Sequence, residues 1–310
     1  MKKVFIDGKA GTTGLRIYER LSKRKDIEIL LLSEEERKDP IARKKALNSC
    51  DIAFLCLPDD AARESVSMIE NENVTVIDTS TAHRTLESWS YGFPELSSDF
   101  EKNLRQSKRI AVPGCHASGF IALVKPLIDE GFISPKQLLT CHSITGYSGG
   151  GKKMIADYQS EAKSELLEAP RQYAISQNHK HLREMKAFSG LNKEPIFCPI
   201  VSDFYSGMMV TVPLFASQLN GQKGIEDIKK LYAQKYTSDI LSFVDSMDQE
   251  GFICGSAMKE KDSMRISVYG NEERILLVAL YDNLGKGASG AAIECMNLVL
   301  GIDPSTGLDI

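Results

Sequence analysis

VFIDGKAGTTG at residues 4–14 is a short apolar run that passes through three glycines into a helical pattern of apolar residues over 15–21. A strand, a glycine turn and a helix in this order are typical of a nucleotide-binding domain. Gly8 permits the tight turn, Gly11 lets a pyrophosphate approach the backbone, and Gly14 lets the helix pack closely on the strand. The spacing GxxGxxG departs from the usual GxGxxG, so a plain strand-to-helix turn is the alternative.

The end of the second expected strand, 27–32, is where such a domain holds the ribose of its cofactor. The residues that follow are Ser33, three glutamates, Arg37 and Lys38. An acidic residue at this point favours NAD, whereas a hydroxyl followed by basic side chains suits the 2′-phosphate of NADP. Ser33, Arg37 and Lys38 therefore indicate NADP, against the alternative of a solvated, charged helix face.

Three further buried strands are expected at 51–57, 74–78 and 110–112, which complete a parallel sheet. The fourth strand of the set leads into the polar loop TSTAHR at 79–84. Ligands of doubly wound sheets bind at this edge, and Arg84 offers a fork that suits a phosphate or carboxylate. An isolated arginine is, however, more often a surface or interface residue.

A cysteine directly follows the last of these strands, in VPGCHASG at 112–119, before an apolar helix at 120–127. A thiol at a helix N-terminus faces unpaired N–H groups and the positive end of the dipole, which favour a thiolate and an adjacent oxyanion. Cys115 is therefore a candidate nucleophile for acyl transfer, where the nicotinamide end of a dinucleotide would reach. The alternative is a cysteine that only packs.

The hydrophobic pattern changes beyond this cysteine, where alternation replaces continuous apolar runs. Strands of an antiparallel or mixed sheet are expected at 138–145, 210–214, 264–269 and 274–281. They predict a second domain. The last apolar helix, 291–300, opens with a glycine-rich loop and a capping serine, Ser289, and is expected to return to the first domain.

Two segments of the second domain carry polar candidates. Ser148, Gly149 and Lys152 lie in a glycine-rich stretch whose backbone amides and lysines would form an anion-binding nest, with a mobile linker as the alternative. His179 and His181 stand two residues apart, so they should diverge on a helix, and only one should face a given site. A lone histidine is more often structural, but beside a candidate thiolate an acid/base role is worth proposing.

Length and composition narrow the class of protein. The chain has 310 residues, enough for two domains, and a net charge of −4, which argues against nucleic-acid binding. No signal peptide or membrane-length apolar stretch is evident. The seven cysteines form no CxxC pair, so we expect reduced thiols, a cytoplasmic location and no metal site.

Several motifs together carry a resemblance to a known family. They are FIDG at 5–8 with AGTTGL at 10–15, DTSTAHR at 78–84, YGFPEL at 91–96, PGC at 113–115 and DNLGKGASG at 282–290. Over nearly its whole length the chain resembles the short form of N-acetyl-γ-glutamyl-phosphate reductase, the NADP-dependent enzyme of arginine biosynthesis. That family shares its mechanism and its two-domain plan with aspartate-semialdehyde dehydrogenase and glyceraldehyde-3-phosphate dehydrogenase.

The resemblance implies an α/β protein with a Rossmann-type, doubly wound parallel sheet and an α+β catalytic domain with a mixed or antiparallel sheet. The NADP-binding domain would comprise 1–113 plus 286–310, and the catalytic and oligomerisation domain 114–285. A homodimer or homotetramer is expected, with a small acyl phosphate and inorganic phosphate as reactants.

The resemblance also implies roles for individual residues. Cys115 is the nucleophile and the histidine pair supplies the acid/base, with His181 chosen first and His179 second. The family usually has HLPEM here, whereas Arg183 replaces the proline in this chain. The expected cofactor-binding residues are Gly8, Ala10, Gly11, Thr12, Thr13, Gly14, Ser33, Arg37, Lys38, Ser80, Asn283, Gly285 and Lys286. The expected substrate-binding residues are Arg84, Ser148, Gly149 and Lys152.

In the implied reaction the Cys115 thiolate displaces phosphate from N-acetyl-γ-glutamyl phosphate, and NADPH reduces the thioester to N-acetylglutamate 5-semialdehyde. Three alternatives stay open. A related reductase of aspartyl phosphate or carrier-bound aminoadipyl phosphate would use the same thiol. A non-catalytic NADP-binding sensor would use Cys115 only for packing. The last in rank is a scaffold protein of the N-acetylglutamate pathway whose main role is association, because it leaves the Cys115 turn and both glycine loops without a purpose.

Overall fold

The computed structural model describes all residues, 1–310, and the chain divides into two compact units. Unit 1 comprises 1–113 and 288–309, and unit 2 comprises 114–287 and Ile310. The elements of unit 1 are β1 (Lys2–Asp7), α1 (Thr12–Leu21), β2 (Ile27–Leu30), α2 (Pro40–Ser49), β3 (Ile52–Leu55), α3 (Asp59–Ser67), β4 (Thr75–Asp78), β5 (Ser90–Tyr91), α4 (Ser98–Gln106), β6 (Arg109–Ala111) and α9 (Gly290–Leu300).

The elements of unit 2 follow in chain order. They are α5 (Cys115–Asp129), β7 (Thr140–Gly146), α6 (Gly151–Gln159), β8 (Arg171–Gln172), α7 (His181–Ser189), β9 (Ile196–Ser202), β10 (Met208–Phe215), α8 (Ile225–Lys235), β11 (Leu241–Phe243), β12 (Met264–Gly270) and β13 (Arg274–Tyr281). None of the helices in either unit combines the length and the apolarity needed to cross a bilayer.

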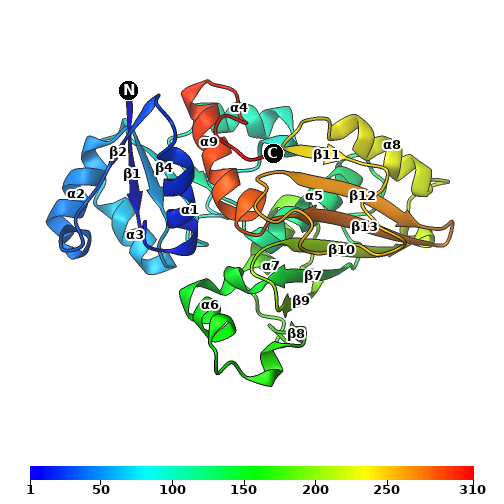
Figure 1. Cartoon of the computed structure of the whole chain (residues 1–310). Coiled ribbons are helices and arrows are strands. Elements are labelled where there is room, and N and C mark those ends of the chain that lie inside the picture. Colours follow the sequence, from blue (N-terminus) through cyan, green and yellow to red (C-terminus); the bar gives the residue numbers. More distant parts are fainter. The chain divides into compact units, whose positions relative to one another are not determined.

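Unit 1 is built on a six-stranded sheet in the order β2-β1-β3-β4-β6-β5, and all of its strand pairs are parallel. Apolar residues of α1, α4 and α9 pack on one face and those of α2 and α3 on the other; Figure 1 shows α2 and α3 on the side of β1 opposite α1. The doubly wound parallel sheet and the return of the last helix are therefore confirmed. Strand β5 was not predicted, because two residues carry no periodic signal.

The glycine turn after β1 has the packing that the sequence predicts. Gly8 has φ +86°, and a Cβ there would lie 2.3 Å from the carbonyl oxygen of Cys56. A Cβ on Gly14 would lie 2.5 Å from the carbonyl oxygen of Gly8, so the helix can approach the turn only without a side chain. Gly11 has more room, since the nearest atom would be 3.4 Å away.

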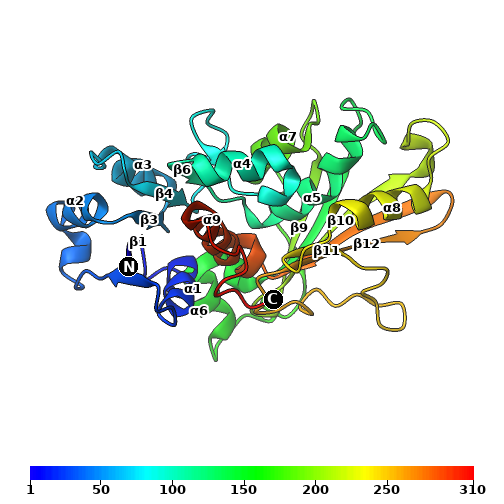
Figure 2. The ribbon, with the colours of Figure 1, turned by 90° about the horizontal axis from the view of Figure 1, so that it is seen from above.

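Unit 2 is built on a seven-stranded mixed sheet in the order β11-β12-β13-β10-β7-β9-β8. The pairs β7/β9 and β11/β12 are parallel and the others antiparallel. Helices α5, α7 and α8 lie along one side of this sheet (Figure 2). The predicted mixed sheet is confirmed.

One expectation about a helix start needs correction. The side chain of Ser289 makes no capping hydrogen bond to α9, because the residue has helical backbone angles and continues a π-helical turn over Gly285–Ser289. The expectation that Cys115 stands at a helix N-terminus is confirmed, because α5 begins at Cys115 and the apolar run from residue 120 continues the same helix. The thiol therefore stands in the first turn of α5.

Candidate active site

The main chain of Cys115 is held from two directions. Gly114, in an extended conformation, is the N-cap of α5, so Cys115 is the first helical residue. The hydroxyl of Tyr281 in β13 donates to the carbonyl oxygen of Cys115 and accepts from the N–H of Gly119 at 3.1 Å. Gly287 packs beside the cysteine, because a Cβ there would lie 3.0 Å from that of Cys115. The result is a partly exposed thiol on a fixed backbone.

A buried carboxylate links this turn to α7. Glu184 Oε2 accepts a hydrogen bond from the N–H of Gly114 at 3.0 Å. Its other oxygen, Oε1, lies 4.0 Å from Nε2 of His181, one helical turn earlier in α7. Glu184 and His181 are both buried, at 1% and 5% exposure. One carboxylate thus contacts the nucleophile's turn and lies within ion-pair distance of a histidine.

The two predicted histidines converge, which corrects the expectation that they would diverge on a helix. Only His181 belongs to α7, and His179 lies in the turn before it. Nδ1 of His179 accepts from the N–H of His181 at 3.1 Å, and the two ring centroids are 4.6 Å apart. Because the turn folds back, both rings reach the same third ring, that of His116, at 5.7 and 5.5 Å.

His116 was not predicted as a functional residue. It is buried, Nδ1 lies 2.7 Å from Oγ of Ser143, and Nε2 lies 2.6 Å from the hydroxyl of Tyr173. Burial, with a smaller contribution from His179, lowers the pKa of His116 to about 3. Burial also raises the pKa of Tyr173 above its ordinary value. The ring is therefore neutral at pH 7, and its hydroxyl partner is protonated.

The glycine-rich stretch after β7 is ordered structure, so the mobile-linker alternative is wrong. Tyr147–Gly150 forms a 3-10 turn and α6 begins at Gly151. Oγ of the buried Ser148 accepts from Nδ2 of Asn283 at 3.0 Å, and Oδ1 of Asn283 accepts from the N–H of Gly207 at 2.9 Å. Gly149 and Lys152 are exposed. The structure thus brings Ser148 and Asn283 together within unit 2.

The loop that carries Asn283, Gly285 and Lys286 is anchored by a buried aspartate. Oδ1 of Asp282 accepts from the N–H groups of Leu284 and Gly285, and Oδ2 accepts from Oγ of Ser206 at 2.8 Å. Gly285 has no room for a side chain, because its Cβ would lie 1.9 Å from the carbonyl oxygen of Lys261. The glycine there is explained by packing, and the cofactor role of the loop stays a prediction.

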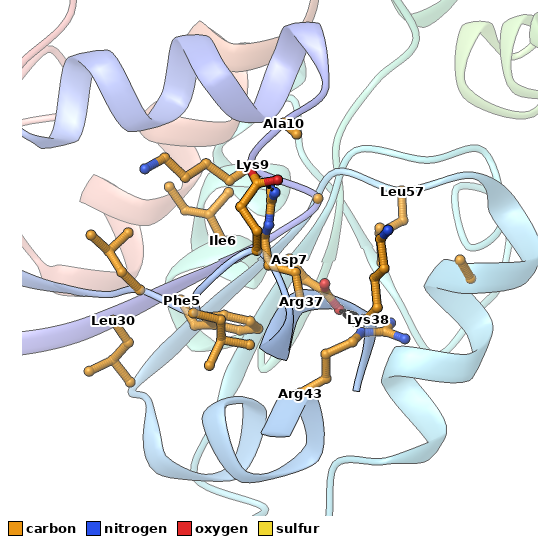
Figure 3. Close-up of a pocket in the computed structure, with 15 residues that line it drawn as sticks. Phe5, Ile6, Asp7, Lys9, Ala10, Leu30, Arg37, Lys38, Arg43 and Leu57 are labelled. Carbon is orange, nitrogen blue, oxygen red and sulfur yellow. Dashed lines mark hydrogen bonds and ion pairs between the residues drawn. The ribbon is translucent and has the colours of Figure 1, made fainter. Parts of the chain in front are cut away.

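Unit 1 contains a cavity of about 360 Å³ at the end of β1. Of the predicted cofactor residues, Gly8, Ala10, Arg37 and Lys38 line it. The cations Lys9 and Arg43 also line it, together with Glu34, and Figure 3 shows Arg43 directed at Asp7. The remaining lining residues are Phe5, Ile6, Asp7, Leu30, Leu31, Leu32, Leu57 and Ala61.

The two arginines at this cavity are paired with carboxylates. Arg43 donates to Asp7 at 3.0 Å through Nη2 and at 3.3 Å through Nε, and Nη1 lies 3.2 Å from Glu64. Arg37 forms an ion pair with Glu34. Ser33 is not among the lining residues. Its hydroxyl accepts from the main-chain N–H of Glu36 at 3.2 Å, and its own N–H donates to the side-chain carboxylate of Glu36 at 2.8 Å.

The polar loop after β4 is also tightly bonded. Oγ of Ser80 donates to the buried Asp78 at 2.7 Å. Arg84 donates from Nε to the carbonyl of Val112 at 2.8 Å and from Nη2 to that of Thr79 at 3.0 Å. These bonds join the loop to the end of the β6 segment. They give Arg84 a structural role in addition to the substrate role that stays predicted.

The chain matches two family models that together span most of its length. Residues 3–103 match the semialdehyde dehydrogenase NAD binding domain, and residues 115–283 match the semialdehyde dehydrogenase dimerisation domain. Unit 1 is therefore similar to a nucleotide-binding domain, and unit 2 to the domain through which such enzymes dimerise.

Curated relatives are similar over the full length. The N-acetyl-gamma-glutamyl-phosphate reductase of Trichormus variabilis is 42% identical and is covered over 99% of each chain. The protein of the same name from Chelativorans sp. is 45% identical over 96% of this chain and 98% of its own. Among solved structures, aspartate semialdehyde dehydrogenase II of Vibrio cholerae has a TM-score of 0.74 at 16% identity, covering 97% of this chain and 98% of its own. That likeness shows the fold.

Proposed function

We propose that this chain, which belongs to the N-acetyl-γ-glutamyl-phosphate reductase family of semialdehyde dehydrogenases, reduces N-acetyl-γ-glutamyl phosphate to N-acetylglutamate 5-semialdehyde through a thioester on Cys115. The curated relatives supply the reaction. One observation supports the mechanism. Cys115 lies in the first turn of α5, and Gly114, the N-cap of this helix, donates a hydrogen bond to the carboxylate of Glu184, which lies beside His181.

Cys115 acts as the nucleophile. The thiolate sulfur bonds to the acyl carbon, the bond from that carbon to the phosphate oxygen breaks, and inorganic phosphate leaves. The N–H groups of His116 and Ala117, in the first turn of α5, are the donors we propose for the oxyanion. Bound NADPH supplies the hydride that reduces the thioester.

His181 is our first choice for the acid/base and His179 our second. When the thiohemiacetal collapses, carbon–sulfur cleavage needs a proton on the sulfur, and imidazolium is a suitable donor near neutral pH. Oε1 of Glu184 lies 4.0 Å from Nε2 of His181, so the carboxylate can orient this ring. The carboxylate also bonds to Gly114, so it holds the acid/base and the nucleophile's turn in one network.

Unit 1 is the NAD(P)-binding domain, and we infer NADP as the cofactor. The cavity at the end of β1 has the cations that a 2′-phosphate needs, in Lys9, Arg37, Lys38 and Arg43. A structural neighbour, the aspartate semialdehyde dehydrogenase of Candida albicans, was solved with NADP, at a TM-score of 0.69 and 16% identity. We keep Thr12, Thr13, Gly14, Ser33, Ser80, Asn283, Gly285 and Lys286 as further proposed cofactor contacts.

For the substrate we retain Arg84, Ser148, Gly149 and Lys152 as the anion-binding residues. Exposed Gly149 and Lys152 next to buried Ser148 give backbone amides, a hydroxyl and a cation within five residues of sequence. An acyl phosphate that also carries an α-carboxylate has two anionic groups and needs such donors at two places. The domain roles are then cofactor binding for 1–113 plus 286–310 and catalysis with assembly for 114–285.

The dimerisation model over 115–283 indicates a homo-oligomer. We propose a homodimer through the side of the unit 2 sheet that lies opposite α5, with a homotetramer as the alternative outcome. Val210 faces α5, so the alternating Met209, Pro213 and exposed Phe215 of β10 face away from it. Leu276, paired with Pro213 and 42% exposed, continues this apolar surface.

All seven cysteines are free, which supports a cytoplasmic location.

Turnover of three acyl phosphates tests the substrate. The enzyme should reduce N-acetyl-γ-glutamyl phosphate with a kcat/KM at least about a hundredfold above those for aspartyl phosphate and carrier-bound aminoadipyl phosphate. Preference for another substrate would make the chain a related reductase. No turnover with any of them, together with NADP binding and slow alkylation of Cys115, would support the sensor instead.

A further inference from the structure

His116 lies at the centre of the histidine cluster of unit 2, directly after the nucleophile in α5. Both of its ring nitrogens lie within hydrogen-bond distance of hydroxyls. Nδ1 of His116 is close to the hydroxyl of Ser143 in β7, and Nε2 of His116 is close to the hydroxyl of Tyr173, which follows β8. Its ring also contacts His179, His181 and Phe197 at centroid distances of 5.7, 5.5 and 5.2 Å. One buried ring thus connects the helix of Cys115 with both candidate acid/base residues.

The two hydroxyl partners suit an uncharged ring. A neutral imidazole offers one N–H donor and one lone pair, and a hydroxyl can either donate or accept. Ser143 and Tyr173 can therefore satisfy both nitrogens without a second charge in the cluster. An imidazolium would need two acceptors, and its charge would be buried beside two further histidines.

The charged and titratable groups around His116 come from several elements. Cys115 precedes it on α5, His181 and Glu184 belong to α7, and His179 and Tyr173 belong to the segment between β8 and α7. The strands add Tyr281 of β13, bonded to the carbonyl of Cys115. Glu184 is the carboxylate of this cluster, and it contacts Gly114 and His181.

We propose that His116 is a positioning residue: a neutral, doubly hydrogen-bonded ring against which His179 and His181 pack, so that the proton exchanged with substrate stays on that pair. The inference rests on the proposed function, because it assigns the acid/base to the pair. The ring of His116 does not touch the reacting atoms in this role. It fixes the orientation of the acid/base rings through the contacts of its own ring.

Each hydrogen bond can be removed alone. Tyr173→Phe removes the partner of Nε2 and keeps the aromatic ring, and Ser143→Ala removes the partner of Nδ1. Tyr236→Phe is the matched control, because the buried Tyr236 donates to the carbonyl of Ala122 at 2.7 Å, six residues beyond His116 in α5. Each of the three variants loses one hydroxyl, and two of them act on His116.

The experiment measures kcat and KM against pH for the three variants. For Tyr173→Phe and Ser143→Ala we expect kcat to fall roughly five- to tenfold, KM to change less than about twofold, and the pH profile to move by about half a unit or more. Tyr236→Phe should lower the unfolding midpoint and leave the profile in place. Equal effects of all three variants on kcat and on the profile would reduce His116 to a packing residue.

A second measurement does not depend on turnover. In Cys115→Ser enzyme, the NMR signal of the His116 ring should show the neutral form throughout pH 5 to 9. Titration of that signal within this range would overturn the proposal. If the wild-type enzyme reduced none of the acyl phosphates, the proposed function would fail, and the NMR result would still decide whether the ring is neutral.

Discussion

Glu184 in α7 accepts a hydrogen bond from the main-chain N–H of Gly114 at 3.0 Å, across 70 residues of sequence. Gly114 is the N-cap of the helix that begins with Cys115, and the same carboxylate lies 4.0 Å from His181. A buried charge is stable only when paired or hydrogen-bonded, so the fold has a physical reason to keep these three groups together.

Glu184→Gln should separate the two roles of this carboxylate. The amide oxygen can still accept from Gly114, but the negative charge beside His181 is lost, so we expect kcat to fall about ten- to a hundredfold with the unfolding midpoint nearly kept. Glu184→Ala should also lose about 1–3 kcal/mol of stability, because it leaves a buried N–H without its acceptor. Kinetics and urea unfolding check both variants against Glu194→Gln, an exposed residue of the same unit. Wild-type kcat in Glu184→Gln would contradict the role.

Two substitutions in the glycine turn separate its two roles. Gly8→Ala tests packing, and Gly11→Ala tests cofactor binding. Gly8→Ala should cost about 2 kcal/mol or more, because φ is +86° and the new Cβ would lie 2.3 Å from a backbone oxygen. Gly11→Ala has 3.4 Å of room and should fold normally. We expect it to weaken NADP binding about tenfold, since its methyl group faces the proposed pyrophosphate. Thermal unfolding and NADP titration measure both; unaltered NADP affinity in Gly11→Ala would place the pyrophosphate elsewhere.

Cofactor choice should depend on the Arg37–Glu34 ion pair at the cavity of unit 1. Arg37→Gln should raise the KM for NADPH about tenfold and leave that for NADH almost unchanged, because NADH lacks the 2′-phosphate. Glu34→Gln should lower the KM for NADPH, because it removes the carboxylate that competes with the 2′-phosphate for Arg37. Arg63→Gln, at an ion pair of α3 with Asp60, is the surface control. Equal changes with both nucleotides would show that Arg37 does not read the 2′-phosphate.

Because His116 is buried, we expect the folded protein to lose stability in acid. Its pKa is about 3 in the folded protein and 6.5 for the ordinary side chain, so the unfolded chain takes up a proton that the folded chain refuses. Stability is therefore lost as pH falls below 6.5, by about 2 kcal/mol at pH 5 from this group. Urea unfolding at pH 7 and pH 5 should show this loss in wild type and not in His116→Gln. The same pH dependence in both proteins would mean that another group causes it.

Much of the fold follows from local patterns. The strand, turn and helix over 4–21 could be predicted because Gly8 and Gly14 each have a local reason, in φ or in close packing. The position of Cys115 also followed, since a Pro-Gly turn before an apolar helix is a local signal. Strand β5 could not be predicted, because Ser90–Tyr91 is held by pairing with β6 rather than by a periodic pattern.

The site was predicted less completely, because its partners are distant in sequence. The convergence of His179 and His181 depends on where α7 begins, and that boundary is not visible in the sequence. Once His181 is known to start the helix, the spacing to Glu184 places both on one face. Arg43 reaches Asp7 across 36 residues, and His116 reaches Tyr173 across 57, so only the tertiary structure could bring either pair together.

The central claim is the thioester on Cys115, and the reverse reaction tests it most directly. NADPH formation from N-acetylglutamate 5-semialdehyde and NADP is measured at alkaline pH, with and without inorganic phosphate, for wild type and Cys115→Ser. We predict formation that requires phosphate and is lost in the variant while its unfolding midpoint and NADP affinity are kept. NADPH formation that persists in Cys115→Ser, or that proceeds equally without phosphate, would contradict the phosphate-cleaved thioester.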